Sequence, residues 1–137
     1  QTHGLVVALD LLLIDIQDAE TGLRGFLLTS EEAYLAPYHR ALPQVQSRMD
    51  TISSAATAEM RERGIVDELR AFVSSKLEVM ALTLEVFQTR GSVEALTLVK
   101  SDRGRSDMDG IRNVISQLRN EAGEERSQRL EEMNASY

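Results

Sequence analysis

The sequence predicts an all-α fold, an antiparallel up-down-up-down four-helix bundle. Apolar residues recur at alternating steps of three and four over long segments, which is the spacing of helices packed lengthwise against one another. No segment alternates with period two, so a sheet is not expected. Turn signals divide the chain of 137 residues into four such segments. We expect helices at about 4–28, 31–57, 59–89 and 93–135, within a single domain that spans residues 1–137.

The first predicted helix has a heptad seam and one polar residue beside it. Glu20 shares a flanking stripe with Val6, Leu13 and Leu27, and an unpaired carboxylate there would cost several kcal/mol of desolvation. Arg24 lies one turn further on, in the favourable acid-before-base order. Two interpretations stay open: a structural ion pair, within this helix or with another helix, or an arginine that offers its guanidinium to a carboxylate ligand. The seam itself consists of Leu5, Leu9, Leu12, Ile16, Ala19, Leu23 and Phe26.

Two glycines interrupt the same helix, at positions 22 and 25. Each would weaken an isolated helix by about 1 kcal/mol. Such glycines usually permit close approach of a neighbouring backbone or a ligand, so we expect one of these beside Gly22 and Gly25.

The second predicted helix has the most regular apolar pattern. Thr29, with Glu32 three residues later, forms a capping-box pattern at its start. Pro43 is expected to kink the helix, because it removes a backbone hydrogen bond. The inward positions are Leu35, Tyr38, Leu42, Val45, Met49, Ile52 and Ala56.

The third and fourth predicted helices meet at Gly91, where Ser92 is expected to cap the fourth. Residues 100–107 contain no apolar side chain, and we favour a continuous fourth helix over a short break there. The packed part should end near Ala122. The inward positions of these helices are Val66, Leu69, Val73, Leu77, Met80, Leu84, Phe87, Met108, Ile111, Ile115 and Leu118.

Composition excludes several functional classes. The net charge of −7 argues against nucleic-acid binding, which needs a basic face. The chain has no cysteine, no apolar run long enough to span a bilayer and no visible signal peptide. His3 and His39 lack the partners of a metal, haem or triad site, so we expect surface histidines, no cofactor and no enzyme activity. Because the helical pattern starts within a few residues of Gln1, we expect an excised domain.

One stretch of the chain resembles a known family. The run Asp18–Thr29, followed by Ser30–Leu35 and Pro37–Tyr38, resembles the CHASE family of extracellular sensor domains, and more narrowly its third, all-helical subtype. Weaker similar motifs are Glu94-Ala95-Leu96 and Met108-Asp109-Gly110-Ile111-Arg112. The resemblance implies a periplasmic or extracellular four-helix sensor between two transmembrane helices of an inner-membrane receptor. Its output would be a histidine kinase of a two-component system, a nucleotide cyclase or a chemotaxis-type domain.

We therefore expect a non-catalytic sensory input domain, from a receptor that is a histidine kinase and forms a homodimer. A small-molecule ligand would bind at the end of the bundle opposite the termini, near the start of the fourth helix and the polar residues Asp102, Arg103, Arg105 and Asp109. The alternative is a structural dimerisation module without a ligand. The predicted ligand-binding or signalling residues are Glu20, Thr21, Gly22, Arg24, Gly25, Thr29 and Arg112.

Overall fold

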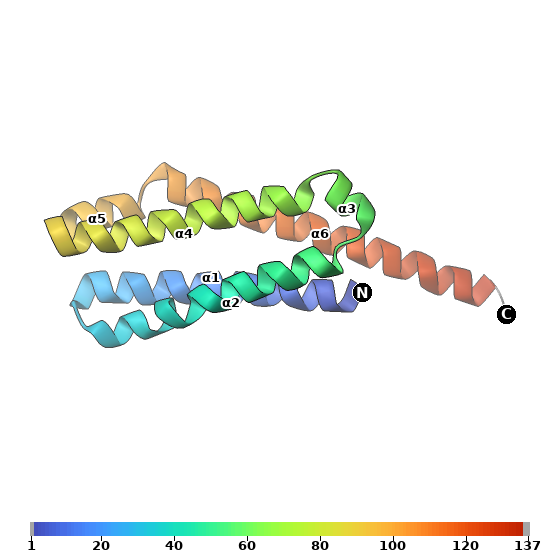
Figure 1. Ribbon diagram of the computed structural model, residues 1–137, viewed down its shortest axis with the longest axis horizontal. Coiled ribbons are helices and arrows are strands. Elements are labelled where there is room, and N and C mark those ends of the chain that lie inside the picture. The colour runs from blue at the N-terminus through green and yellow to red at the C-terminus, as the bar shows by residue number, and fades with distance from the viewer. Residues whose placement is uncertain (1, 136–137) are drawn as a thin grey trace.

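The computed structural model describes residues 2–135, apart from the side chains of residues 2, 102 and 126. Over this range the fold is all-α, and its helices fit a four-helix bundle (Figure 1). No helix in the described range is long and apolar enough to cross a membrane. The elements are α1 (Thr2–Thr29), the 3-10 turn η1 (Glu32–Tyr34), α2 (Leu35–Ala55), α3 (Ala58–Glu62), α4 (Ile65–Arg90), α5 (Ser92–Val99) and α6 (Asp102–Ala135).

The helices lie in two layers (Figure 1). One layer is the hairpin of α1 and α2, and the other is α4 with α5 and α6 beside it. The α1–α2 turn and the α4–α5 turn lie at one end, which we call the distal end. Both chain ends lie toward the opposite, proximal end, where α6 extends beyond the other helices.

The apolar core is divided into two clusters along the bundle. The proximal cluster includes Leu5 to Ile16 of α1 and the buried residues of α6, while the distal cluster includes Ala19 to Leu27 of α1. All seven predicted seam residues of α1 are buried, so that seam is confirmed. At the distal end Phe26 packs edge-on against Phe87, with ring centroids 5.0 Å apart. Burial also raises the pKa of Tyr38 above its ordinary value of 10.0.

The predicted third helix is wrong in one respect, because it is divided in two. Gly64 adopts a left-handed conformation with φ +74°, which glycine tolerates best, and separates α3 from α4. Thr57 caps the short α3, since its side chain accepts a hydrogen bond of 3.1 Å from the backbone N–H of Met60.

The continuous fourth helix is also wrong. Lys100 and Ser101 separate α5 from α6, and the rest of the predicted polar stretch begins α6. The polar stretch gives the core no apolar side chain that would hold a straight helix in place. The observed break brings the buried backbone of Gly104 against Lys76 and Val79 of α4. As predicted, the packed part of α6 ends near Ala122, and residues 127–135 are exposed.

Two predicted caps differ from the structure. Thr29 accepts a 3.1 Å hydrogen bond from the N–H of Glu31 and donates one of 2.8 Å to the carbonyl of Gly25, so it closes the turn without a capping box to Glu32. Ser92 is the first residue of α5 and makes no cap; Gly91, with φ +97°, takes the cap position. Glycine reaches that conformation without steric cost, which permits the sharp turn from α4 into α5.

Candidate functional site

Gly22 and Gly25 bring α1 against the start of α2. A Cβ atom at Gly22 would lie 2.6 Å from the carbonyl oxygen of Tyr34, and one at Gly25 would lie 2.7 Å from the ring of Tyr34. The predicted close approach is thus confirmed, and the neighbour is protein. Together with Thr21, these glycines border a shallow depression beside Pro37. They lie on the other side of α1 from Glu20, given a rotation of about 100° per residue.

Glu20 has its ion-pair partner on another helix. The Lys76 ammonium of α4 donates a 2.5 Å hydrogen bond to the Glu20 carboxylate, and also reaches the carbonyl oxygen of Gly104 at 3.4 Å. The Lys76 side chain is only 7% exposed, against 28% for Glu20. Of the two predicted forms of a structural pair, Glu20 makes the one between helices, and no Glu20–Arg24 ion pair forms among the described side chains. Lys76 is the more strongly desolvated group and so the one in need of a partner.

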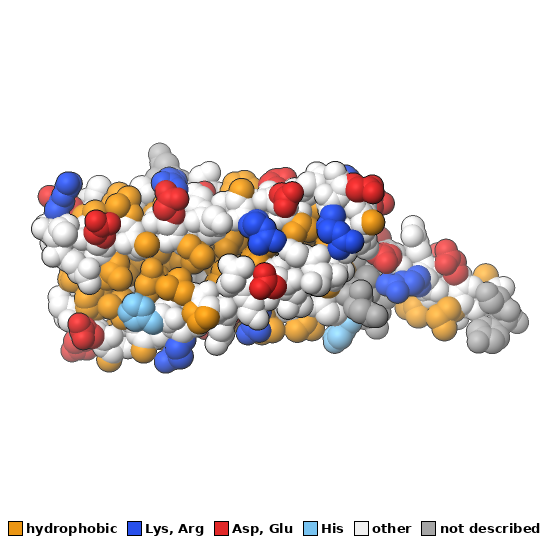
Figure 2. All heavy atoms as spheres, in the orientation of Figure 1, with side chains coloured by type: hydrophobic (Ala, Val, Ile, Leu, Met, Phe, Trp, Pro, Cys, Tyr) orange, Lys and Arg blue, Asp and Glu red, His pale blue; other side chains and the backbone are white. Residues whose placement is uncertain are grey.

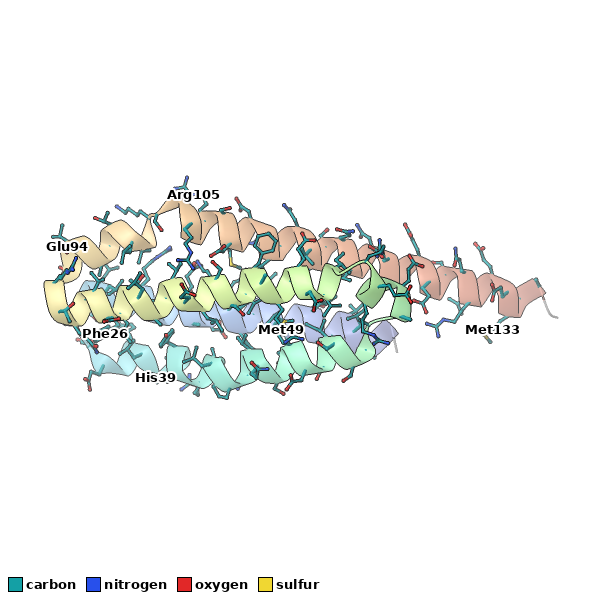
Figure 3. All side chains as sticks on the ribbon, turned by 45° about the horizontal axis from the view of Figure 1, so that its top comes forward. Phe26, His39, Met49, Glu94, Arg105 and Met133 are labelled. Atoms are coloured by element: carbon teal, nitrogen blue, oxygen red, sulfur yellow. The ribbon has the colours of Figure 1, made fainter. Side chains whose placement is uncertain are left out.

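A cleft of about 250 Å³ opens above this ion pair, between α1, α4 and the α5–α6 break. It contains three of the predicted site residues, Glu20, Arg24 and Arg112, whereas Thr29 lies at the distal turn. Figure 3 shows Arg105 beside the break, at the start of α6. The lining residues are Glu20, Arg24, Lys76, Val99, Lys100, Gly104, Arg105, Met108, Asp109 and Arg112.

A narrow apolar recess of about 20 Å³ continues inward from the same residues. Its walls add Leu23 of α1 and Val79, Met80 and Thr83 of α4. The recess also keeps Glu20, Arg24 and Lys76 in its lining, so its floor is only partly apolar.

The cleft is strongly basic within an acidic chain. Five basic side chains face two acidic ones, an excess of three positive charges, although the chain carries a net charge of −7. Among the described side chains, Arg24, Lys100, Arg105 and Arg112 have no carboxylate partner, and all four are exposed. The first turn of α6 adds the positive end of a helix dipole.

Polar contacts fix the start of α6 on α4. Ser75 donates a 2.6 Å hydrogen bond to Asp107, and Arg103 donates one of 3.2 Å to Ser75 and one of 3.0 Å to Glu78. Arg103, which we expected near the ligand site, thus helps to hold the start of α6 against α4. Of its predicted neighbours Arg105 and Asp109 line the cleft, and the side chain of Asp102 lies outside the described residues.

Sequence reasoning missed Lys76 as a site residue. A signal was present, since Lys76 lies three residues after Val73 and four before Met80, on the inward face of its helix. The described residues hold no group of three or more His, Cys, Asp or Glu side chains suited to a metal ion. The chemistry that this arrangement supports is electrostatic capture of a small anion.

Comparisons with known proteins give two matches. A family model described as the CHASE3 domain matches residues 1–132. The crystal structure of the Rhodopseudomonas palustris histidine kinase HK9 sensor domain is similar with a TM-score of 0.80 and 24% sequence identity, over 90% of this chain and 97% of that one. Among curated proteins, none matches. At this identity the structural likeness shows a shared fold.

Proposed function

Since the chain belongs to the CHASE3 family of sensor domains, we propose that it is the extracytoplasmic input domain of a receptor histidine kinase in the inner membrane. The similar solved structure is the sensor domain of a histidine kinase, which supports this type of output. In this proposal the bundle has the up-down-up-down order expected from the sequence. Both chain ends then point toward flanking transmembrane helices.

The observation that carries the proposal is the course of α6. This helix of 34 residues starts at the basic cleft, packs on α4 and α1, and leaves the core after Ala122. Beyond that point Leu130 and Met133 are exposed apolar residues, as Figure 3 shows for Met133. A change in packing at the cleft would therefore move one continuous helix that extends toward the output.

Cross-linking in the full-length receptor tests this role of α6. The chain has no cysteine, so paired cysteines can be introduced cleanly. Asp10 of α1 and Arg119 of α6 form an ion pair, and cysteines at these positions joined by a short bis-maleimide would fix α6 to α1. We expect severalfold altered autophosphorylation on cross-linking, because α6 is no longer free to shift.

The matched control joins α1 to its hairpin partner. Asp15 and Arg48 lie 3.0 Å apart across α1 and α2, and the same cross-link there should leave autophosphorylation nearly unchanged. If both links have the same effect, or if neither changes autophosphorylation, α6 does not transmit the signal.

The second candidate function is a dimerisation module that needs no ligand. Val7, Ile14 and Leu28 recur at multiples of seven along α1 and are exposed, Ile14 by 49% and Leu28 by 69%. Figure 2 also shows a band of hydrophobic side chains over the distal half, between α2 and α4. A second copy of the chain would cover the α1 stripe as in a coiled coil.

A charge placed in this stripe tests the second candidate. We expect Ile14→Glu to shift a dimer to monomer in sedimentation equilibrium, because the carboxylate would be desolvated in the interface. Gln44→Glu is the control. Gln44 is exposed on α2, so this substitution adds the same charge outside the stripe. A wild-type chain that is monomeric at high concentration would count against this candidate in the isolated domain.

A further inference from the structure

We propose that the basic cleft binds a small organic acid with two or three carboxylates. The effect of binding on signalling rests on the proposed function. The binding itself does not.

The charge of the cleft requires an anion with more than one negative charge. Its unpaired cations come from three parts of the chain: Arg24 from α1, Lys100 from the α5–α6 break, and Arg105 and Arg112 from α6. Like charges gathered in one cleft repel one another, and a bound polyanion relieves that repulsion. Guanidinium groups also match carboxylates with paired hydrogen bonds, which favours carboxylate as the chemical group.

The two carboxylates of the cleft leave this excess in place. Lys76 already neutralises Glu20 through the 2.5 Å hydrogen bond, so the pair contributes no net charge. Asp109 lies on the wall with no ion-pair partner among the described side chains and opposes the four unpaired cations alone. A formal excess of three positive charges therefore faces the ligand.

Size and lining favour an organic acid over an inorganic ion. The cleft, at about 250 Å³, is smaller than the roughly 300–1,000 Å³ of sites for drug-sized ligands. Val99 and Met108 form apolar parts of its wall. The recess behind, about 20 Å³, has room for about one water and adds no space for the ligand. A short carbon chain between carboxylates fits such a lining, whereas phosphate would leave the apolar surface unused.

Such a ligand would connect the first helix to the last. Its carboxylates would bridge Arg24 of α1 and Arg105 or Arg112 of α6, which line the same cleft. Binding would therefore favour the packing in which the start of α6 lies closer to α1.

Calorimetric titration of the 137-residue chain with citrate and succinate tests the site, with phosphate and aspartate as comparison ligands at constant ionic strength. We expect citrate and succinate to bind one per chain. Arg24→Gln and Arg112→Gln, on different helices, should each weaken binding about tenfold, which is about 1.4 kcal/mol. Arg40→Gln removes the same charge from an exposed side chain of α2 and should leave affinity unchanged. Circular dichroism verifies that each variant is folded.

Several results would overturn the proposal: no heat with either acid at millimolar concentration, equal weakening by Arg40→Gln, or binding of phosphate or aspartate in preference to both acids. The signalling role fails separately. If citrate or succinate binds as predicted but leaves autophosphorylation of the full-length receptor unchanged, the binding site is confirmed and its role in signalling is wrong. If the receptor responds to another stimulus and binds neither acid, the proposed ligand site is wrong, while the proposed sensory function remains.

Discussion

Replacing Gly22 by alanine is expected to destabilise the domain by about 2 kcal/mol, through overpacking of a close helix contact. The added Cβ would lie 2.6 Å from the Tyr34 carbonyl oxygen and 3.3 Å from the Cβ of Pro37. The nearest atom belongs to the backbone, so α1 and the start of α2 would have to separate. Thermal unfolding measures the effect, and a loss of this size corresponds to a fall of about 6–10 °C for a domain of intermediate size.

Gly123→Ala is the control for this substitution. Both glycines lie inside helices, so alanine adds the same intrinsic helix propensity at each. At Gly123 nothing lies within 4 Å of the added Cβ, and stability should stay equal or rise slightly. If both variants raise stability alike, the close approach at Gly22 does not constrain the helix pair.

The second large effect is expected from Lys76→Met, which leaves the Glu20 carboxylate without its partner. Lys76 is buried, with its ammonium between Glu20 of α1 and Gly104 of α6, and methionine keeps much of the apolar stem. The lost charged hydrogen bond should lower the free energy of unfolding by about 2 kcal/mol, reduced from the fully buried case because Glu20 is 28% exposed. Denaturant unfolding measures it.

A double-mutant cycle separates the pair from the packing. We expect Lys76→Met combined with Glu20→Leu to lose less stability than the sum of the two single variants, because no unpaired charge remains. Arg103→Met, which breaks the exposed pair with Glu78 and the exposed hydrogen bond to Ser75, should cost less than Lys76→Met. Additive effects of Lys76→Met and Glu20→Leu would contradict the coupling.

The parts of the fold that local pattern determines could be predicted from the sequence. The α1 seam, the close contact at Gly22 and the end of packing near Ala122 each follow from residues within one helix. The breaks at Gly64 and at Lys100–Ser101 could not be predicted with the same reasoning. Gly64 and the stretch 100–107, which has no apolar side chain, mark places where a helix can break, but tertiary packing decides whether it does.

The site was predicted only in part for the same reason. Arg24 and Arg112 belong to motifs that the family resemblance singles out, and both line the cleft. Arg105 was expected near the site, whereas Lys100 joins the cleft because it lies at the α5–α6 break, which the predicted continuous helix did not contain. Lys76 replaces Arg24 as the partner of Glu20 through a contact between residues 56 positions apart. Spacing rules within one helix do not predict a contact between two helices.

The division of the core into two clusters has a consequence for how such a receptor could change over time. Glu20, Lys76 and Gly104 form a polar layer where the distal cluster meets the proximal one. Arg24 and Lys100 line the cleft but belong to neither cluster, so substitutions there leave the apolar contacts that position α6 near Ala122 in place. Under the proposed function, the ligand specificity of the cleft could thus diversify by mutation while the packing of α6, which would carry the signal, is kept.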